Sequence, residues 1–438
     1  MSVSKSRRKL RGVFLRHDKH TQDMETVRLP MPAAVKLPML QHMGKPCRPL
    51  VKKGDLVKVG QKIGDCDELF SVPVHASVSG EVTELQEYTA VGGAVTQAVV
   101  IRPDGEQAVS EEIAPPTVTD RESFLKAVRE SGLAGMGGAG FPAHVKLGYK
   151  DVNRLDTLVI NAAECEPYIT SDYRECLEHT ADVIEGIQAV KKWLRIDNAY
   201  IGVEDDKPAA IRALDEAAAG DSGIQVVKLH SKYPQGAEKV IIYTATGRVV
   251  EDGKLPADHG VLVMNVSSVA FLARYLKTGM PFISRRLTVD GPVVRKPQNV
   301  EVPLGTPIGE VLRFCDTDEE AVKMILMGGP MMGVCVYDPE TPVIKNNNAV
   351  LAFDQKNAQV PKTTACIRCG KCVYVCPMNL MPAALEKAYD SKNAAALTAM
   401  SVNLCMNCGC CSYICPAKRN LAQKNQLAKA YLKEQKQK

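Results

Sequence analysis

Eight of the fifteen cysteines fall into two runs with the same spacing. The runs are Cys366, Cys369, Cys372 and Cys376 before Pro377, and Cys405, Cys408, Cys411 and Cys415 before Pro416. In such a run three thiolates wrap one corner of a cubane, and the fourth, at the head of the next helix, binds a second cubane. We therefore predict two [4Fe–4S] clusters, one held by Cys366, Cys369, Cys372 and Cys415, and the other by Cys405, Cys408, Cys411 and Cys376.

Zinc is the alternative metal for these runs, because paired cysteines also build zinc ribbons. The twofold repeat of all four spacings, with the proline, favours the cubanes. Cys410 breaks the register and is interpreted as a non-ligand. Clustered thiols in a chain without a secretory signal also argue against a disulfide scaffold.

A second candidate site is a glycine-dense loop formed by Gly135, Gly137, Gly138 and Gly140. It satisfies GxGxxG but follows an expected helix over 123–131 rather than a strand, so it is not a Rossmann fingerprint. Without Cβ atoms its amides can still approach a phosphate or a flat ring, although a flexible turn is the alternative. Polar and aromatic residues follow in the order Phe141, Lys146, Asn161, Glu164 and Glu166.

The first hundred residues contain short predicted strands that are separated by glycines, which indicates a small barrel or sandwich. Beyond a capping box predicted at 119–122, strands alternate with helices, which favours a mainly parallel sheet with ligands at the carboxyl ends of its strands. The expected strands are 157–161, 199–203, 224–229 and 261–266, and the expected helices are 172–194, 207–219 and 267–278. Short strands return over 286–336 with one helix near 308–314, which indicates a small α+β unit.

Composition excludes several classes of protein. With 45% hydrophobic and 24% charged residues the chain is globular, and 5% aromatic residues argue against stacking platforms for nucleic acid. No apolar run reaches the length of a membrane-spanning helix, and we expect a soluble, cytoplasmic protein.

Residues 360–438 carry twelve Lys and Arg against three Asp and Glu, a net charge of +9, while the whole chain carries +5. A basic module of this kind suits an acidic redox partner or a larger assembly.

The residues 132–146 and 161–167 resemble the flavin- and NADH-binding subunit of NADH–quinone oxidoreductases. Together with the N-terminal barrel and the two cysteine runs, they make the chain similar to the C-subunit family of Rnf-type ferredoxin–NAD⁺ oxidoreductases. The barrel itself resembles lipoyl and biotinyl carriers but lacks their lysine at 73–76, so we interpret it as a docking or structural module. The resemblance implies a multidomain α/β and α+β chain with four domains: a barrel-sandwich domain at 1–112, a Rossmann-like FMN/NADH-binding domain at 113–283, a β-grasp domain at 284–353 and a two-cluster ferredoxin-like helical domain at 354–438.

The resemblance also implies roles for single residues. The four loop glycines would line FMN, Lys146 would neutralise its phosphate, and Asn161 would hold the flavin edge. Glu166 would lie where the nicotinamide nucleotide stacks, with Phe141 facing the adenine. Glu164, Glu238 and Asn265 would complete the cofactor contacts. Ala163 replaces an aspartate of the quinone-reductase relatives, which removes one flavin contact.

The implied activity is electron transfer between the clusters, FMN and NAD(H) in a peripheral subunit on the cytoplasmic face of the membrane. Integral partner subunits would translocate the ions, iron–sulfur subunits would be further partners, and ferredoxin would be an indirect partner. Two alternatives remain at this point: a soluble, NADH-dependent cobalamin reductase, and a non-catalytic electron wire that has lost its flavin site.

Overall fold

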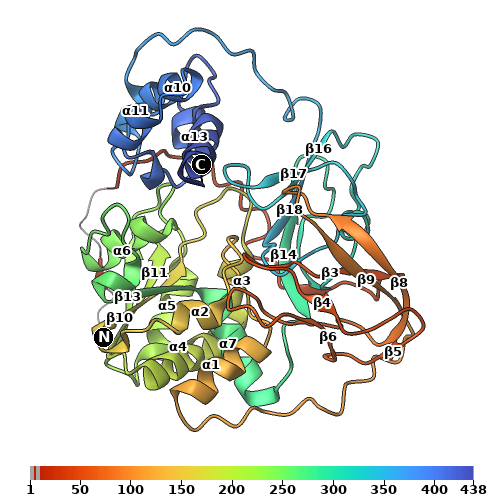
Figure 1. The fold of residues 1–438 in the computed structure, drawn as a ribbon. Helices are drawn as coiled ribbons and strands as arrows, with labels where there is room; N and C mark the ends of the chain where they lie inside the picture. Colours follow the sequence, from red (N-terminus) through yellow and green to blue (C-terminus); the bar gives the residue numbers. More distant parts are fainter. Residues whose placement is uncertain (1–3, 6–9, 438) are drawn as a thin grey trace.

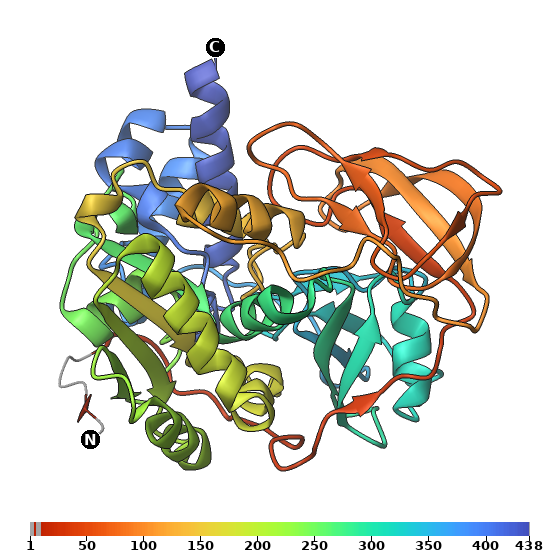
Figure 2. The same cartoon turned by 90° about the horizontal axis from the view of Figure 1, so that it is seen from below.

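The computed structural model describes residues 4–5 and 10–437, which form two β sheets of a sandwich, an α/β unit, a mixed-sheet unit and a C-terminal helical unit (Figure 1). In the view of Figure 1 the helical unit lies above the α/β unit and the sandwich lies to the right. Figure 2 shows the same arrangement from below, with the sandwich and the mixed-sheet unit on one side of the molecule.

The sandwich consists of two antiparallel sheets whose inward side chains are completely buried. Val35 and Leu37 of one strand pack with Ile63, Val82 and Ile101 in its core. The first sheet contains β3 (Val35–Pro38), β9 (Val95–Pro103), β8 (Gly80–Thr89) and β5 (Leu56–Val57). The second contains β4 (Arg48–Pro49), β6 (Lys62–Asp65) and β7 (Val74–His75).

The α/β unit is built on a five-stranded parallel sheet with helices on both faces. In spatial order its strands are β1 (Ser4–Lys5), β12 (Ile224–Leu229), β11 (Asn198–Glu204), β10 (Thr157–Ala162) and β13 (Val261–Asn265). Leu158 and Ile160 face one side and Val159 faces the other, so β10 is a continuous apolar run, as expected where both faces are covered.

The helices of this unit divide between the two faces of the sheet. One face is covered by α3 (Ser171–Glu178), α4 (Thr180–Leu194), α5 (Pro208–Ala218) and α7 (Val266–Thr278), and the other by α6 (Glu238–Thr246). The remaining helical segments are α1 (Arg121–Glu130), α2 (Ala143–Leu147), η1 (Val152–Arg154) and η2 (Pro256–His259).

The other two units follow in the chain. The mixed sheet has the order β17 (Val334–Val336), β16 (Met324–Met327), β18 (Ala349–Phe353), β14 (Ser284–Asp290), β15 (Gln298–Pro303) and β2 (Val27–Arg28), with α8 (Ile308–Phe314) beside it. A mostly exposed linker at 354–365 leads to α9 (Lys371–Tyr374), α10 (Pro382–Asp390), α11 (Ala394–Ala399), η3 (Val402–Leu404), α12 (Cys410–Tyr413) and α13 (Leu421–Gln437).

The four parallel strands expected from the sequence are confirmed to within a residue or two, but two local predictions are wrong. The expected helix 172–194 is broken at His179, because ion pairs from Arg286 of β14 hold α3 against the mixed sheet. The capping box of α1 is formed by Asp120 and Ser123 instead of residues 119 and 122. Its Asp120 Oδ1 accepts from Ser123 N at 2.8 Å, and Ser123 Oγ accepts from Asp120 N at 3.0 Å.

The N-terminal segment pairs with two sheets outside the sandwich. Residues Ser4–Lys5 pair in parallel with β12, and Val27–Arg28 pair in parallel with β15 of the mixed sheet. The chain then enters the sandwich at β3. The predicted domain boundaries stay a proposal.

Close packing of α4 on α7 generates a stability prediction. A Cβ at Gly186 would lie 2.0 Å from the carbonyl oxygen of Val269, so a side chain there must push the two helices apart. We expect Gly186→Ala to lower the free energy of unfolding by about 1–3 kcal/mol, measured by chemical denaturation. Gly220→Ala is the matched control, because its Cβ would meet no atom within 4 Å. Equal stability of the two variants would contradict the packing described.

Candidate redox site

The expected flavin residues gather at one edge of the parallel sheet. Strand order reverses at β10, with β11 and β12 on one side of it and β13 on the other. Asn161 at the end of β10 is the register partner of Asn265 at the end of β13. Open α/β sheets bind their ligands outside the carboxyl ends of the strands at such a reversal. The sheet therefore provides a binding edge where the sequence places its polar residues.

The glycine loop lies against this edge and is fixed at both sides. Its ends are joined by a hydrogen bond from Gly135 N to Phe141 O at 2.8 Å. A Cβ at Gly137 would lie 3.4 Å from Cβ of Asn265, which shows how closely the loop backbone approaches β13. Gly138 has a φ of +103° and open space beside it, a conformation that only glycine adopts without strain. The loop is thus a shaped surface and not a flexible turn.

Side chains of α7 and of the mixed-sheet unit hold the same loop. Ser268 Oγ accepts from Met136 N at 3.0 Å, and the fully buried Arg285 donates to Met136 O at 2.9 Å. Asn346 Nδ2 donates to Gly138 O at 2.8 Å. Sequence reasoning missed Arg285 and Asn346, because both come from the mixed-sheet unit more than 140 residues away and carry no motif.

Lys146 and Glu238 face each other beside the loop. Lys146 Nζ lies 2.8 Å from Glu238 Oε1 and donates to Val263 O at 3.1 Å, and both side chains are partly exposed. Glu238 is the first residue of α6. A partly exposed cation next to closely approachable backbone is the donor set that a phosphate and a flat ring require. These residues therefore fit FMN.

The two asparagines make contacts within the protein. Asn161 Nδ2 donates to Gly236 O at 2.7 Å and ties β10 to the turn before α6. Asn265 caps α7 by accepting from the backbone of Ser267 at 3.0 Å, and its amide donates to Asp172 at 2.6 Å. Their amides fix the walls of the binding edge.

The two glutamates of the motif have different surroundings. Glu164 accepts from the backbone amides of Asp172 and Tyr173 at 2.6 and 3.0 Å, so its carboxylate binds the first turn of α3. Glu166 Oε2 accepts from Met331 N at 3.0 Å, whereas its Oε1 is buried without a hydrogen-bond partner. Burial raises the pKa of Glu166 to about 7. Glu204 Oε1 and Tyr233 Oη, on residues of the same pocket, are likewise buried without a partner. Unpartnered buried polar atoms of this kind are candidates for contacts with a ligand.

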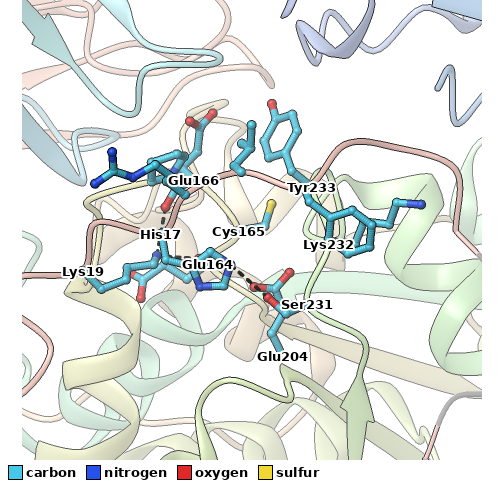
Figure 3. Close-up of a pocket in the computed structure, with 13 residues that line it drawn as sticks. His17, Lys19, Glu164, Cys165, Glu166, Glu204, Ser231, Lys232 and Tyr233 are labelled. Carbon is cyan, nitrogen blue, oxygen red and sulfur yellow. Dashed lines mark hydrogen bonds between the residues drawn. The ribbon is translucent and has the colours of Figure 1, made fainter. Parts of the chain in front are cut away.

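Glu166 lines a pocket between the α/β unit and the N-terminal segment (Figure 3). Cys165 and Tyr233 lie around the same pocket, as do Lys19 and Glu204. Phe141, on the loop, forms an edge-to-face pair with Phe70 of the sandwich, with ring centroids 5.8 Å apart. No motif or spacing marks Phe70 or Lys19 as neighbours of the site.

The eight motif cysteines line two cavities in the crossed arrangement that the spacing predicts. One cavity is lined by Cys366, Cys369, Cys372 and Cys415, and the other by Cys376, Cys405, Cys408 and Cys411. Cys410 also lines the second cavity, and its Sγ lies 3.9 Å from the carbonyl oxygen of Tyr233. Within residues 4–5 and 10–437, no group of three or more His, Cys, Asp or Glu side chains is arranged so that it could hold one metal ion. The two sets of four thiolates fit two cubanes, in which each thiolate binds a different iron.

The cavities differ in exposure. Cys366 and Cys369 are exposed, whereas Cys376, Cys408 and Cys411 are buried. The buried cavity packs against Val13 and Tyr233, close to Cys165, in a small apolar cluster. This contact joins the helical unit to the binding edge of the parallel sheet.

Fold and site together define an iron–sulfur flavoprotein of several units. Three family models match the chain: the Nuo51 FMN-binding domain over residues 128–274, the RnfC barrel sandwich hybrid domain over 8–106 and the 4Fe-4S dicluster domain over 365–418. The predicted fold class is confirmed by these matches. Among the described residues, no helix has the length and apolarity needed to cross a membrane.

Curated relatives identify the family. The C subunit of the Na⁺-translocating ferredoxin:NAD⁺ oxidoreductase complex of Acetobacterium woodii is 40% identical over 365 residues, which cover 83% of this chain and 82% of the relative. Its proton-translocating counterpart in Clostridium ljungdahlii is 40% identical over 372 residues (84% and 81%), and the C subunit of the ion-translocating oxidoreductase complex of Rhodobacter capsulatus is 36% identical over 400 (89% and 77%). The chain belongs to this family of C subunits.

A solved structure supports the fold alone. A chain of the NAD⁺-reducing [NiFe]-hydrogenase in the air-oxidized state aligns with a TM-score of 0.52 at 19% identity. The alignment covers 72% of this chain and 63% of that chain.

The crossed cysteine sets generate a prediction. We expect Cys366→Ser to remove one cluster and to lower the iron content from about eight to about four atoms per chain, with the signal of the other cluster retained in electron paramagnetic resonance. Cys410→Ser is the control and should keep all the iron, because Cys410 lies outside the register. Full iron content in Cys366→Ser, or loss of a cluster in Cys410→Ser, would show that the sets are assigned wrongly.

Proposed function

We propose that this chain passes electrons between NAD(H), FMN and two [4Fe–4S] clusters as the peripheral arm of an ion-translocating ferredoxin:NAD⁺ oxidoreductase complex. One observation carries the proposal: the buried cysteine cavity packs against Tyr233, beside the carboxyl edge that bears the glycine loop. In this proposal the contact brings the two-electron site and a one-electron site next to each other in one polypeptide. The names of the curated relatives favour the complex over the cobalamin reductase.

The flavin would be held by residues that already line the sheet edge. The backbone of Gly135, Gly137, Gly138 and Gly140 would contact the ring and the phosphate of FMN. Lys146 would leave its ion pair with Glu238 and pair with the phosphate instead. When bound, FMN supplies the conversion between a hydride and single electrons, which nicotinamide and cubanes cannot exchange directly. Asn161 and Asn265 would fix the walls of this pocket through their contacts with Gly236 and Asp172.

Glu166 would contact the nicotinamide nucleotide through its unpartnered Oε1. A carboxylate there stabilises the positive charge that develops on the nicotinamide ring as the hydride leaves. With a pKa of about 7, Glu166 is about half ionised at neutral pH, so this stabilisation grows as the pH rises through 7. Phe141 and Tyr233 would bound the same space.

The exposed cavity would exchange electrons with a partner protein. Ile367 and Tyr374 beside it are 67% and 79% exposed, and the neighbouring cations Arg368 and Lys371 are exposed as well. An apolar centre with a basic rim fits an acidic redox protein. We infer that integral membrane and iron–sulfur subunits dock here, that ferredoxin acts through them, and that the chain lies on the cytoplasmic face of the membrane.

A spectrum of the anaerobically purified protein, recorded before and after NADH, tests this function. We expect a flavin band together with broad iron–sulfur absorbance, and bleaching of both on addition of NADH. Cluster absorbance without flavin or without any response to NADH would leave only an electron wire and would overturn the proposal.

Charge reversal at Lys146 tests the phosphate contact. We expect Lys146→Glu to reduce the flavin content by at least about tenfold, since a carboxylate repels the phosphate, while cluster absorbance stays unchanged. Lys150→Glu reverses an exposed charge nearby and should retain the flavin. Normal flavin content in Lys146→Glu would refute the phosphate role of Lys146.

A further inference from the structure

Residues 10–24, here called the N-terminal strap, cross the α/β unit beside the Glu166 pocket. Val13 forms an antiparallel bridge with Tyr233, with N–O distances of 2.9 and 3.1 Å in the two directions. His17 O accepts from Tyr168 N at 2.8 Å on the opposite side of the pocket. The strap is therefore bonded to both loops that form the pocket walls (Figure 3).

Lys19 makes the most extensive contact of the strap with the pocket. Its ammonium donates to three backbone carbonyls, those of Glu164 at 2.9 Å, Glu166 at 2.8 Å and Ile169 at 2.5 Å. All three donors of one ammonium are thus used on a single turn of chain. Figure 3 shows Lys19 reaching under Glu164 and Glu166 from the strap.

Burial of the Lys19 ammonium and its repulsion by Lys207 lower the pKa of Lys19, and the carboxylates of Glu164, Glu204 and Asp206 oppose this by attracting the ammonium. Glu204 is 2% exposed and its Oε1 has no hydrogen-bond partner, so the carboxylate faces the pocket without a neutralising contact at that atom. An enclosed ammonium needs such partners, and moving it away would leave three carbonyls without donors.

As a result, both the backbone carbonyl and the side-chain carboxylate of Glu166 are held in place. Lys19 fixes its backbone carbonyl, and Met331 N fixes one oxygen of its side chain at 3.0 Å. A Cβ at Gly329 would lie 2.3 Å from that same oxygen, so there is no room for the carboxylate to move in this direction. The other carboxylate oxygen is buried and has no hydrogen-bond partner among the described residues.

We infer that Lys19 is a positioning residue for nicotinamide nucleotide binding, acting through the backbone of the loop that carries Glu166. The inference deepens the proposed function and rests on it, because it takes Glu166 as a contact of the nucleotide. The strap, which lies outside the α/β sequence motif, is then part of the binding site.

Steady-state kinetics of the anaerobic, cofactor-loaded full chain test this inference, with NADH as substrate and ferricyanide as electron acceptor. We expect Lys19→Met to raise the KM for NADH by about tenfold and to change kcat by less than about twofold, because a loosened Glu166 weakens ground-state and transition-state binding alike. Flavin and iron contents should equal those of the wild type. Lys19→Gln keeps N–H donors without the charge and should raise KM by less.

Two control variants distinguish the loss of the Lys19 contacts from a general loosening of the strap. Thr21→Val removes the 2.5 Å hydrogen bond between Thr21 and Thr170, which loosens the strap at the end of the same loop but leaves the three hydrogen bonds of Lys19 in place. Lys53→Met removes an exposed lysine of the sandwich. Both should keep the wild-type KM.

An unchanged KM in Lys19→Met, or an equal rise of KM in Thr21→Val, would overturn the inference. If Lys19→Met does not fold, the comparison of Lys19→Gln with Thr21→Val decides: a rise in KM confined to Lys19→Gln supports positioning, and equal values refute it. A wild-type protein that fails to oxidise NADH would instead contradict the proposed function itself, so the two failures are distinguishable.

Discussion

The packing of Tyr233 against Cys408 and Cys410 fixes the helical unit relative to the parallel sheet, and the rest of the redox arrangement depends on it. The linker at 354–365 is mostly exposed and provides little restraint of its own. The apolar cluster around Tyr233 contains Val13 from the strap and Val375 from the helical unit, so three distant parts of the chain meet at one point. A change in this cluster would alter the distance between the two kinds of site while leaving each one intact.

Buried cations also fix neighbouring units of the chain relative to one another. Arg285 donates to Met136 O and Asn347 O, and Lys345 donates to Pro73 O and Gly132 O. Together with Lys19, these residues connect the glycine loop, the sandwich and the Glu166 loop through main-chain carbonyls. A buried charge requires several well-placed acceptors, so each cation defines a narrow range of loop positions. Burial lowers the pKa of Lys345 to about 7, so the charge at this junction changes near neutral pH.

Much of the architecture could be predicted because its signals are local. Cysteine spacing predicted the crossed grouping that the two cavities now show, and apolar runs such as Ile224–Leu229 marked the strands of the parallel sheet. The contacts that shape the site could not be predicted, since Arg285, Asn346 and Lys19 reach it from other units and no periodicity marks them. The break at His179 could not be predicted for the same reason. The orientation of α3 is set by ion pairs with Arg286, which lies in a strand more than 100 residues later.

The unequal exposure of the two cysteine sets has a consequence for the handling of the protein. Cys366 and Cys369 are open to solvent, whereas most thiols of the other set are shielded. Thiolate oxidation follows accessibility, so air and chelators should attack the outer set first. Under the proposed function, partly damaged preparations would then keep their reaction with NAD(H) and small artificial dyes while losing electron exchange with other subunits of the complex.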